Sequence, residues 1–322
     1  MTNYAVTLDD VKAAARRIAG VAHRTPIMTC ATLDEMAGRQ LYFKCEQWQK
    51  VGAFKFRGAY NAVMKLSDAD ARKGVVTHSS GNHAQALALA AKLRGIPAHI
   101  VMPSSAPPVK KRGVLGYGAE VVECAPTLPA REETVAQVQA RTDAVLIPPY
   151  NHPDVIAGQG TVALEMLDAL PDLDAIIAPI GGGGLMAGVA LAAKALKPSI
   201  RLFAAEPLGA DDAARSKAAG TLIPQTAPNT IADGLLTSMG DLTWPVVRDC
   251  VEAVVTVKED EIVRAMRLTW ERAKLLIEPS SAVAVAAVLT PRFRELQGLR
   301  KIGVVLSGGN VNLDALPWRT PS

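Results

Sequence analysis

The chain has 322 residues, of which 49% are hydrophobic and 20% charged, and its formal net charge is +4 at pH 7. This composition is typical of a folded globular protein, and a small net charge without a long basic run argues against nucleic-acid binding. No apolar run is long enough to span a membrane, and the amino-terminal residues MTNYAVTLDD lack a signal-peptide profile. The four cysteines, Cys30, Cys45, Cys124 and Cys250, are too far apart for a zinc or disulfide framework, so we expect a cytoplasmic protein.

Short apolar runs alternate with helical patterns from Gly74 onward. The first series predicts strands over 74–80, 98–103, 119–124 and 144–150, with helices over 82–95, 106–118 and 129–142. The second series predicts strands over 173–180, 200–206 and 301–307, and helices over 185–196, 259–276 and 281–289. This alternation indicates an α/β protein with parallel sheets, in which ligands bind at the carboxyl ends of strands.

A lysine stands between two phenylalanines in the stretch KVGAFKFRGAYN, residues 50–61. The surroundings of Lys55 are apolar, and lysine is almost never fully buried without a partner or a task. Desolvation lowers the pKa of a buried amine, so Lys55 is a candidate nucleophile near neutral pH.

Four consecutive glycines, Gly181 to Gly184, separate a predicted strand from a predicted helix. Their free backbone N–H groups and the helix amino terminus favour binding of a phosphate. Gly182, Gly184 and Ala187 also fit the dinucleotide pattern G-x-G-x-x-A, with Glu206 near the place of a ribose-binding acid. A nicotinamide dehydrogenase is therefore an alternative, but it leaves Lys55 without a role.

The polar loop that opens the predicted helix at 82 contains Ser79, Ser80, Asn82 and His83. Its hydroxyls and N–H groups could hold a carboxylate and an oxygen of a ring. Ser80 or Asn82 could instead be a simple helix cap, and His83 could be a structural histidine.

Ser307 ends the last predicted strand, in the stretch VVLSGGN, where its hydroxyl could bond a ring nitrogen. Phe54, next to the lysine, offers an aromatic wall. An amine, a phosphate cradle, a carboxylate loop and a serine facing a ring are together what an aldehyde cofactor with a phosphate arm requires.

These motifs resemble the β-family, fold type II, of pyridoxal-phosphate (PLP) enzymes, in the group of serine racemases, serine/threonine dehydratases and 3-hydroxyaspartate ammonia-lyases. The similarity covers nearly the whole chain, from RTPIMT to VLSGGNVNL, and includes GAFKFRGAYNAV, THSSGNHAQALALAAK, VIAGQGT, GGGGLMAG, TIADG and LLIEPSSAV. It implies a tryptophan-synthase-β-like fold with two open, mostly parallel sheets. Residues 1–65 and 152–322 would form the large PLP-binding domain, and residues 70–151 the small domain.

The resemblance also implies the site residues. The residues expected to contact the cofactor are Phe54, Lys55, Asn82, Gly181, Gly182, Gly183, Gly184, Leu185, Gly234, Glu278 and Ser307. The residues expected to contact the substrate are Ser79, Ser80, Asn82, His83, Arg131 and Ser238. Lys55 would be the Schiff-base lysine, Asn82 would bond the phenolic oxygen of the ring, and Ser307 would face its nitrogen. A serine there implies a weaker electron sink than an aspartate, which favours elimination or racemisation over transamination.

Ser80 decides between branches of the group. Degradative threonine dehydratases tend to carry alanine at this place, whereas racemases and hydroxyaspartate lyases carry serine. A hydroxyl opposite Lys55 can deliver or remove a proton on the other face of the substrate.

The stretch EPLGADD raises the question of a metal. By resemblance, Glu206, the carbonyl of Ala210 and Asp212 bind a divalent cation, and oxygen ligands suit Mg²⁺, with Ca²⁺ or Mn²⁺ as alternatives. The alternative is a solvated acidic start of a helix.

Substrate and partners follow from resemblance alone. The stretch VGAFKFRGA is more like that of the hydroxyaspartate lyases, and Arg131 is a candidate to bind a second carboxylate of the substrate. Both favour 3-hydroxyaspartate over serine or threonine. The alternative is that Arg131, a lone arginine on a polar helix, is simply solvated. Dehydration and deamination would yield an oxo acid and ammonia, and serine racemase activity is the alternative. The resemblance further implies a homodimer and is compatible with a nucleotide effector, for which the sequence has no motif. The lack of a long apolar run predicts no membrane partner.

Overall fold

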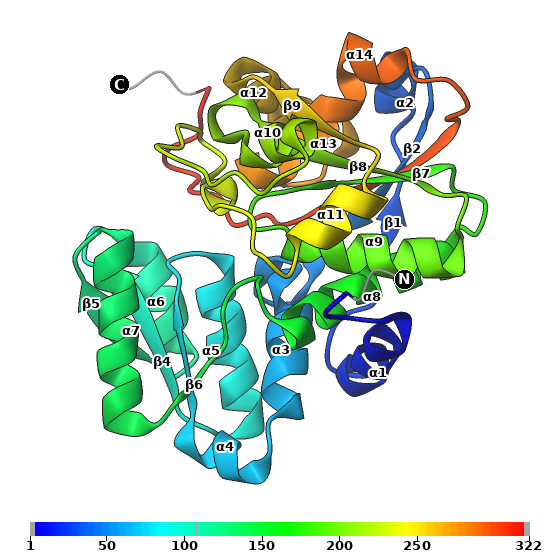
Figure 1. Ribbon diagram of the computed structural model, residues 1–322. Helices are drawn as coiled ribbons and strands as arrows, with labels where there is room; N and C mark the ends of the chain where they lie inside the picture. The colour runs from blue at the N-terminus through cyan, green and yellow to red at the C-terminus, as the bar shows by residue number, and fades with distance from the viewer. Residues whose placement is uncertain (1–3, 107, 319–322) are drawn as a thin grey trace.

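The computed structural model describes residues 4–106 and 108–318, in which two β-sheets lie in separate parts of the molecule (Figure 1). The six-stranded sheet has the order β1-β2-β10-β7-β8-β9; β1 is antiparallel to β2 and the other pairs are parallel. Its strands are β1 Ile27–Met28, β2 Gln40–Cys45, β7 Ala175–Pro179, β8 Arg201–Pro207, β9 Ala253–Val257 and β10 Lys301–Leu306.

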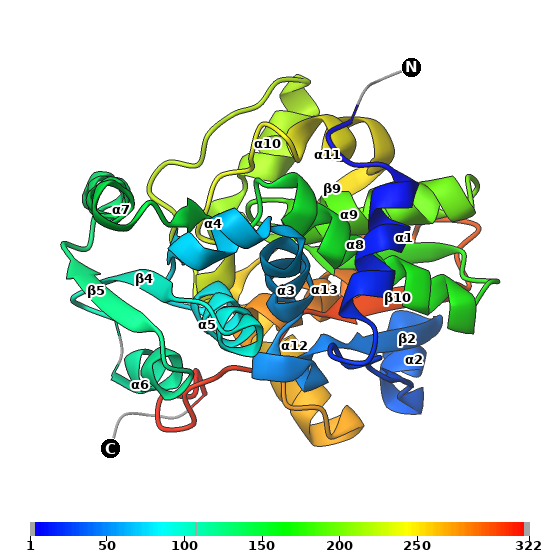
Figure 2. The same ribbon diagram turned by 90° about the horizontal axis from the view of Figure 1, so that it is seen from below.

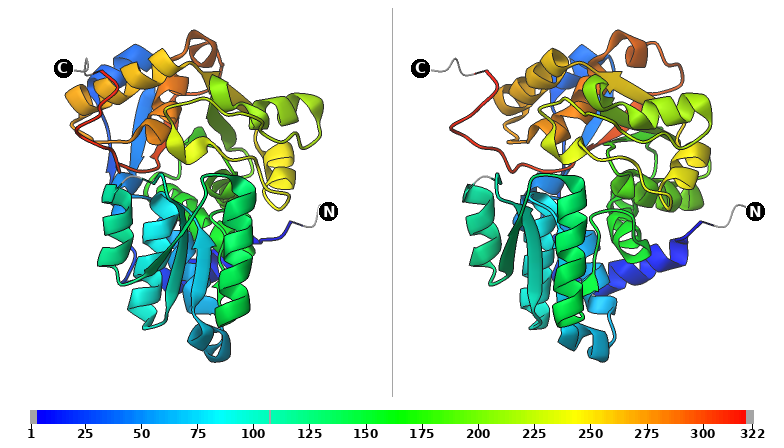
Figure 3. Two further views of the ribbon diagram at one scale, coloured as in Figure 1. Left: turned by 90° about the vertical axis from the view of Figure 1, so that its left-hand side faces the viewer. Right: turned by 60° about the vertical axis from the view of Figure 1, so that its left-hand side comes forward.

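The four-stranded sheet has the order β5-β4-β3-β6 and is parallel throughout. Its strands are β3 Val75–His78, β4 Ala98–Pro103, β5 Glu120–Cys124 and β6 Val145–Leu146. We call the elements from α4 to β6, residues 68–146, the small lobe, and the remaining elements the large lobe. Figure 3 shows the small lobe as a block against one side of the large lobe.

Helices cover both faces of each sheet. In the large lobe they are α1 Leu8–Ile18, α2 Ala31–Ala37, α3 Lys55–Lys65, α8 Pro153–Ala169, α9 Gly184–Leu196, α10 Asp212–Ala219, α11 Trp244–Cys250, α12 Glu259–Leu268, α13 Pro279–Leu289 and α14 Pro291–Arg294. In the small lobe they are α4 Asp68–Lys73, α5 Asn82–Arg94, α6 Pro108–Gly116 and α7 Leu128–Thr142. Short helical turns are η1 Glu46–Trp48, η2 Lys50–Gly52, η3 Leu208–Ala210, η4 Asp233–Leu235 and η5 Thr269–Ala273.

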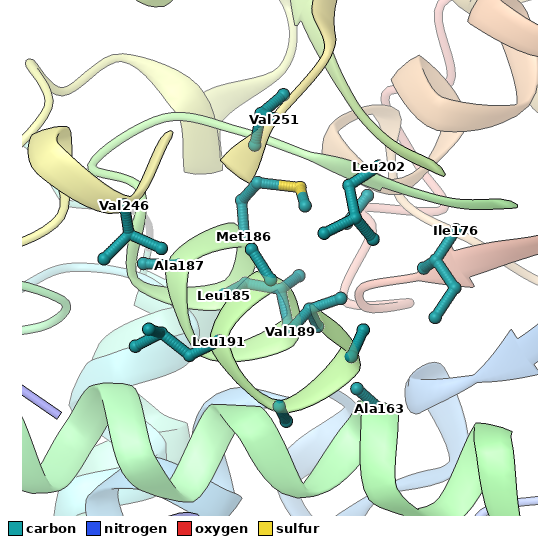
Figure 4. Packing of buried hydrophobic residues seen from close by; sticks show 14 of the residues in the cluster. Ala163, Ile176, Leu185, Met186, Ala187, Val189, Leu191, Leu202, Val246 and Val251 are labelled. Atoms are coloured by element: carbon teal, nitrogen blue, oxygen red, sulfur yellow. The ribbon is translucent and has the colours of Figure 1, made fainter. Parts of the chain in front are cut away.

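The core of the large lobe lies on both faces of its sheet. On one face, α1, α8, α9 and α11 form a buried apolar cluster with the strands, and on the other face α2, α12, α13 and α14 do so. Figure 4 shows Met186 and Val189 of α9 among Ile176 and Leu202 of the sheet. Helices α8 and α9 approach closely, since a Cβ placed on Gly188 of α9 would lie 2.4 Å from a backbone oxygen of α8. A parallel sheet covered on both faces explains the near-continuous apolar runs in the sequence.

Helix α3 lies between α5 of the small lobe and α8 of the large lobe (Figure 2). Its residues Phe56, Ala59 and Val63 belong to the buried cluster that includes α5 and the small sheet. Helix α7 covers the opposite face of that sheet. The helix that begins at Lys55 therefore joins the two lobes.

Two predicted elements differ from the structure. The strand predicted over 144–150 is only β6: the N–H of Ile147 still bonds the carbonyl of Val76 at 2.9 Å, and Pro148 and Pro149, which cannot donate to a sheet ladder, come next. The helix predicted over 259–276 is α helical only to Leu268, continues as the π turn η5, and ends where Lys274 takes φ +58°. Within residues 4–106 and 108–318, no helix combines the length and apolar character needed to cross a bilayer.

Candidate functional site

Lys55 is the first residue of α3 and lies at the boundary between the lobes. Its Nζ donates a hydrogen bond to the carbonyl of Pro149 at 2.7 Å and lies 5.2 Å from the centre of the Phe54 ring. Burial lowers the pKa of Lys55 to about 8, although the negative charge of Glu278 opposes the shift. A substantial fraction of this amine is therefore unprotonated, and nucleophilic, near pH 8.

The tetraglycine turn Gly181–Gly184 runs from the end of β7 into the first residue of α9. Gly183 has φ +85°, in the region that favours glycine. A Cβ on Gly182 would lie 2.3 Å from the ring of Tyr150, and one on Gly183 would lie 2.6 Å from Oγ1 of Thr243. Side chains are therefore excluded here, and the backbone N–H groups with the amino terminus of α9 form a cradle suited to an anion. The next residue, Leu185, is buried in the core.

A hydrogen-bonded group links the lobes beside Lys55. Asn82 at the start of α5 donates to Oε1 of Glu278 at 2.8 Å, and Asn310 donates to Oδ1 of Asn82 at 2.8 Å and, through its backbone N–H, to Oε2 of Glu278 at 3.0 Å. Burial, followed by the charge of Asp233, raises the pKa of Glu278 to about 8. The side chain of Asn82 is thus held in the site by partners from the large lobe.

Ser307 follows β10 and is buried next to this group. Its carbonyl accepts a hydrogen bond from the backbone N–H of Phe54 at 3.0 Å, and a Cβ on the following Gly308 would lie 2.7 Å from Oε1 of Glu278. The structure therefore brings together Lys55, Phe54, Glu278 and Ser307, although they come from distant parts of the sequence.

The residues predicted to bind substrate at the start of α5 differ in their burial and in their hydrogen bonds. Ser79 accepts a hydrogen bond from the N–H of Gly81 at 3.3 Å, and Ser80 is half-buried between them. His83 is buried, and its Nε2 lies 2.8 Å from the carbonyl of Ile147. Burial, with a smaller effect of the Lys55 charge, lowers the pKa of His83 to about 3, so the ring is neutral. This geometry favours the structural alternative for His83.

Arg131 lies in the first turn of α7, and its Nε is buried without a hydrogen-bond partner among the residues that the structure describes. After burial, the positive charge of Arg131 is the main cause that lowers the pKa of His78, the last residue of β3. The Arg131 guanidinium therefore acts on the carboxyl end of β3, where the loop with Ser79 and Ser80 begins.

Gly234, in η4, and Ser238, in the segment that follows, both make hydrogen bonds within the chain. Oγ of Ser238 accepts a hydrogen bond from the N–H of Gln225 at 2.9 Å, so it is engaged within its own loop. The N–H of Gly234 donates to Oγ of Ser280 at 2.9 Å. The hydrogen bond of Thr237 to Tyr150 opposes the rise that burial causes in the pKa of Tyr150.

Glu206 and Asp212 form a buried acidic pair at the end of β8 and the start of α10. The Glu206 carboxylate accepts hydrogen bonds from the N–H groups of Ala213 and Ala214 at 3.0 and 2.9 Å, and Oδ2 of Asp212 accepts one from Met239 at 2.9 Å. Burial raises the pKa of both acids, that of Glu206 to about 9. Oδ1 of Asp212 is buried without a partner in the described part of the chain.

Ala210, whose carbonyl is the third predicted ligand, is buried in η3 between these two acids. No group of three or more His, Cys, Asp or Glu side chains suited to a metal occurs within residues 4–106 and 108–318. Without a cation, the pKa values of both carboxyl groups are raised and one carboxylate oxygen has no partner among the described residues. The residues therefore fit a cation that prefers oxygen ligands.

Sequence reasoning did not single out three residues of this site. Tyr150 packs on the tetraglycine turn, and the neighbouring Asn151 accepts a hydrogen bond from the N–H of Leu242 at 3.0 Å. Asn310 ties Asn82 to Glu278. Only Asn310 carried a signal, as the last residue of SGGN.

Comparison with known proteins identifies the family. The family model described as "Pyridoxal-phosphate dependent enzyme" matches residues 18–308. The chain is 55% identical to a serine racemase from Arabidopsis thaliana, with 97% of this chain and 96% of the relative covered, and 51% identical to a β-hydroxyaspartate dehydratase from Paracoccus denitrificans, with 98% and 99% covered. The structure of maize serine racemase superposes with a TM-score of 0.95 at 53% identity, covering 97% of this chain and 95% of the maize chain.

These findings confirm the predicted fold class and the predicted resemblance, and they set aside the dehydrogenase alternative. The cradle and the activated lysine fit the phosphate and the aldehyde that the family name implies. The chain belongs to the pyridoxal-phosphate-dependent enzyme family, in the fold type II group that contains dehydratases, ammonia-lyases and racemases.

Proposed function

We propose that the protein dehydrates and deaminates a β-hydroxy amino acid, with 3-hydroxyaspartate favoured over serine and threonine, and releases an oxo acid and ammonia. The observation that carries the choice of substrate is Arg131, whose Nε is buried without a partner. A buried guanidinium N–H without a partner is costly, and a carboxylate is the partner that a guanidinium binds best. 3-Hydroxyaspartate has a second carboxylate for this role, whereas serine and threonine have none.

In this proposal the residues described above divide the work. Gly181–Gly184 hold the phosphate, and Ser307 and Asn82 orient the ring. Lys55 would hold the cofactor aldehyde, and its amine, whose pKa is lowered to about 8, would be the base for the α-proton. PLP supplies the conjugated system that accepts the electrons of the broken bond. The loop of Ser79 and Ser80, at the amino terminus of α5, binds the α-carboxylate.

We also propose that Glu206, the carbonyl of Ala210 and Asp212 bind a divalent cation, Mg²⁺ first. The support is the buried acidic pair and the unpartnered Oδ1 of Asp212. The cation would fix the turn from β8 to α10 and act on stability rather than on the chemical step.

The substrate proposal is tested by release of ammonia and oxo acid from the 3-hydroxyaspartate isomers, L-serine, D-serine and L-threonine. In Arg131→Gln we expect kcat/KM for the preferred 3-hydroxyaspartate isomer to fall about 10- to 150-fold, the loss of a hydrogen bond to a charged group, and kcat/KM for L-serine to change little. Arg141→Gln is the matched control, since Arg141 lies in the same helix but pairs with Glu120 on the surface at 3.1 Å. Equal losses for both substrates would refute the role of Arg131.

Serine racemase activity is the second candidate, favoured by the 55% identity to a plant serine racemase and by the hydroxyl of Ser80 in the loop before α5. In Ser80→Ala we expect interconversion of L- and D-serine to be lost while dehydration of L-serine persists. The enantiomer ratio and oxo acid are measured in the same reaction. Parallel loss of both activities would count against Ser80 as the second proton-transfer group.

A further inference from the structure

Lys110 and Asp233 form an ion pair that joins the two lobes. Lys110 lies in α6 of the small lobe, Asp233 opens η4 of the large lobe, and Nζ lies 2.6 Å from Oδ2. The Lys110 side chain is 28% exposed and that of Asp233 52%, so solvent reaches both partners. In Figure 1 the small lobe lies beneath the loops that follow α10, to which η4 belongs.

The turn η4 is fixed against the tetraglycine cradle. A Cβ on Gly181 would lie 3.0 Å from Cα of Leu235, so the two backbones touch. Gly234 is bound to Ser280 of α13 through its N–H. Any force that Lys110 exerts on Asp233 therefore acts between the small lobe and the wall of the cradle.

The ion pair and the Asn82–Glu278 hydrogen bond join the same two lobes. The charges of both Asp233 and Lys110 reach Glu278, the first raising its pKa and the second lowering it. The lobes meet through the apolar packing of α3 against α5 as well as through these polar contacts. Domains of one chain are expected to move relative to each other unless their interface is large and hydrophobic. The lobe that carries Ser79, Ser80 and Arg131 must be held close to Lys55 for the proposed reaction.

We infer that Lys110 is a positioning residue: its ion pair with Asp233 holds the small lobe against the cofactor cradle and favours the closed arrangement of the site. The effect on turnover rests on the proposed function, but the effect on closure does not. An ion pair this exposed shifts the equilibrium between open and closed forms modestly, by about 1.5- to fivefold.

The adjacent residue provides a matched control. Lys111 lies in the same helix and pairs with Glu123 at the same distance, 2.6 Å, but both partners belong to the small lobe. Lys110→Met and Lys111→Met therefore remove the same charge and the same kind of ion pair, and only the first removes a link between lobes.

Hydrogen–deuterium exchange of the PLP-loaded enzyme tests closure without any substrate. In Lys110→Met we expect segments 79–84 and 230–236 to exchange about 1.5- to fivefold faster than in the parent protein, and no change in Lys111→Met. Equal rates in the two variants, whether raised or unchanged, would overturn the inference. A protein that releases no ammonia from any amino acid would refute the proposed function and leave this test intact.

Steady-state kinetics and charge reversal complete the test. If the open form must close to bind substrate, Lys110→Met raises KM by no more than the factor by which the equilibrium shifts and leaves kcat unchanged. Lys110→Asp and Asp233→Lys should each weaken closure, and the double variant should restore KM and exchange to within about 1.5-fold of the parent. A double variant as impaired as the sum of the single ones would show that the pair does not act as a unit.

Discussion

Two buried groups of charged residues in the large lobe differ in whether the chain neutralises them. Arg57 of α3 bonds Glu46 through Nε at 2.7 Å and Glu165 through Nη1 at 2.6 Å, and Lys44 bonds Glu165 at 2.5 Å. Arg57 and Glu46 are fully buried. Burial alone would lower the pKa of Arg57, but the two carboxylates raise it. This cluster balances two cations with two anions.

The second group, Glu206 and Asp212, contains only acids, and burial raises the pKa of both. The difference between the two groups separates a structural cluster of buried charges from a binding site. A cluster whose charges and hydrogen bonds are satisfied within the chain is structural, whereas one that is left with surplus charge and an unpartnered oxygen indicates a ligand from outside.

The largest expected effect follows from breaking the satisfied cluster. Arg57→Met leaves Glu46 and Glu165 buried with reduced pairing, and we expect the free energy of unfolding to fall by about 3–5 kcal/mol. Chemical denaturation measures the change. A loss below about 1 kcal/mol would mean that the cluster is not held as a dry, paired unit.

The acidic pair should respond to a cation and the satisfied cluster should not. Mg²⁺ at about 100 times its dissociation constant should stabilise the chelator-treated protein by about 2.7 kcal/mol. Asp212→Asn should remove most of this gain, while Asp211→Asn keeps it, since Asp211 pairs with Arg215 at 2.8 Å on the surface. The same response in both variants would place the cation elsewhere.

The pH dependence of stability should separate the two groups in the metal-free protein. Burial raises the pKa of Glu206 from 4.5 to about 9, so between these values the folded chain keeps a proton that the unfolded chain has lost. Stability therefore falls as pH rises through this range, by at most about 1.4 kcal/mol per pH unit for one group. Denaturation at a series of pH values checks the slope, which Glu206→Gln should reduce. An unchanged slope in that variant would assign it to other groups.

The smallest effect is expected for an exposed pair. Arg24 and Asp168 form a salt bridge with side chains 62% and 70% exposed. Arg24→Ala should lower the free energy of unfolding by about 0.2–1 kcal/mol, and less in high salt. A loss comparable to that of Arg57→Met would contradict the distinction drawn here between buried and exposed pairs.

The cradle and Lys55 could be predicted because their chemistry is local. Four glycines between a strand and a helix, and a lysine in an apolar run, have few uses other than the ones proposed. Strand ends that lie at one edge of a parallel sheet then bring Ser307 and the tetraglycine turn together. The alternation of elements likewise predicted an α/β protein with parallel sheets, whereas the fold type came from the resemblance of the motifs.

Contacts between distant residues could not be predicted. Nothing in the sequence shows that Asn310 bonds both Asn82 and Glu278, or that Arg57 is fully buried among acids, because such partners are chosen by the packing of the lobes. The same limit applies to Ser238 and His83: residue type fits a binding role, but their hydrogen bonds are to the chain itself. The sequence predicted that prolines close the strand over 144–150, but β6 ends at Leu146, before both Pro148 and Pro149.

Lys55 is the residue on which the whole account depends. Borohydride treatment of the PLP-loaded protein should reduce the carbon–nitrogen double bond between lysine and cofactor and fix the label to one peptide. Peptide mapping by mass spectrometry should then find the phosphopyridoxyl group on Lys55, and Lys55→Ala should take up no label there. A label on another lysine, or an unmodified Lys55 in fully loaded protein, would contradict the account.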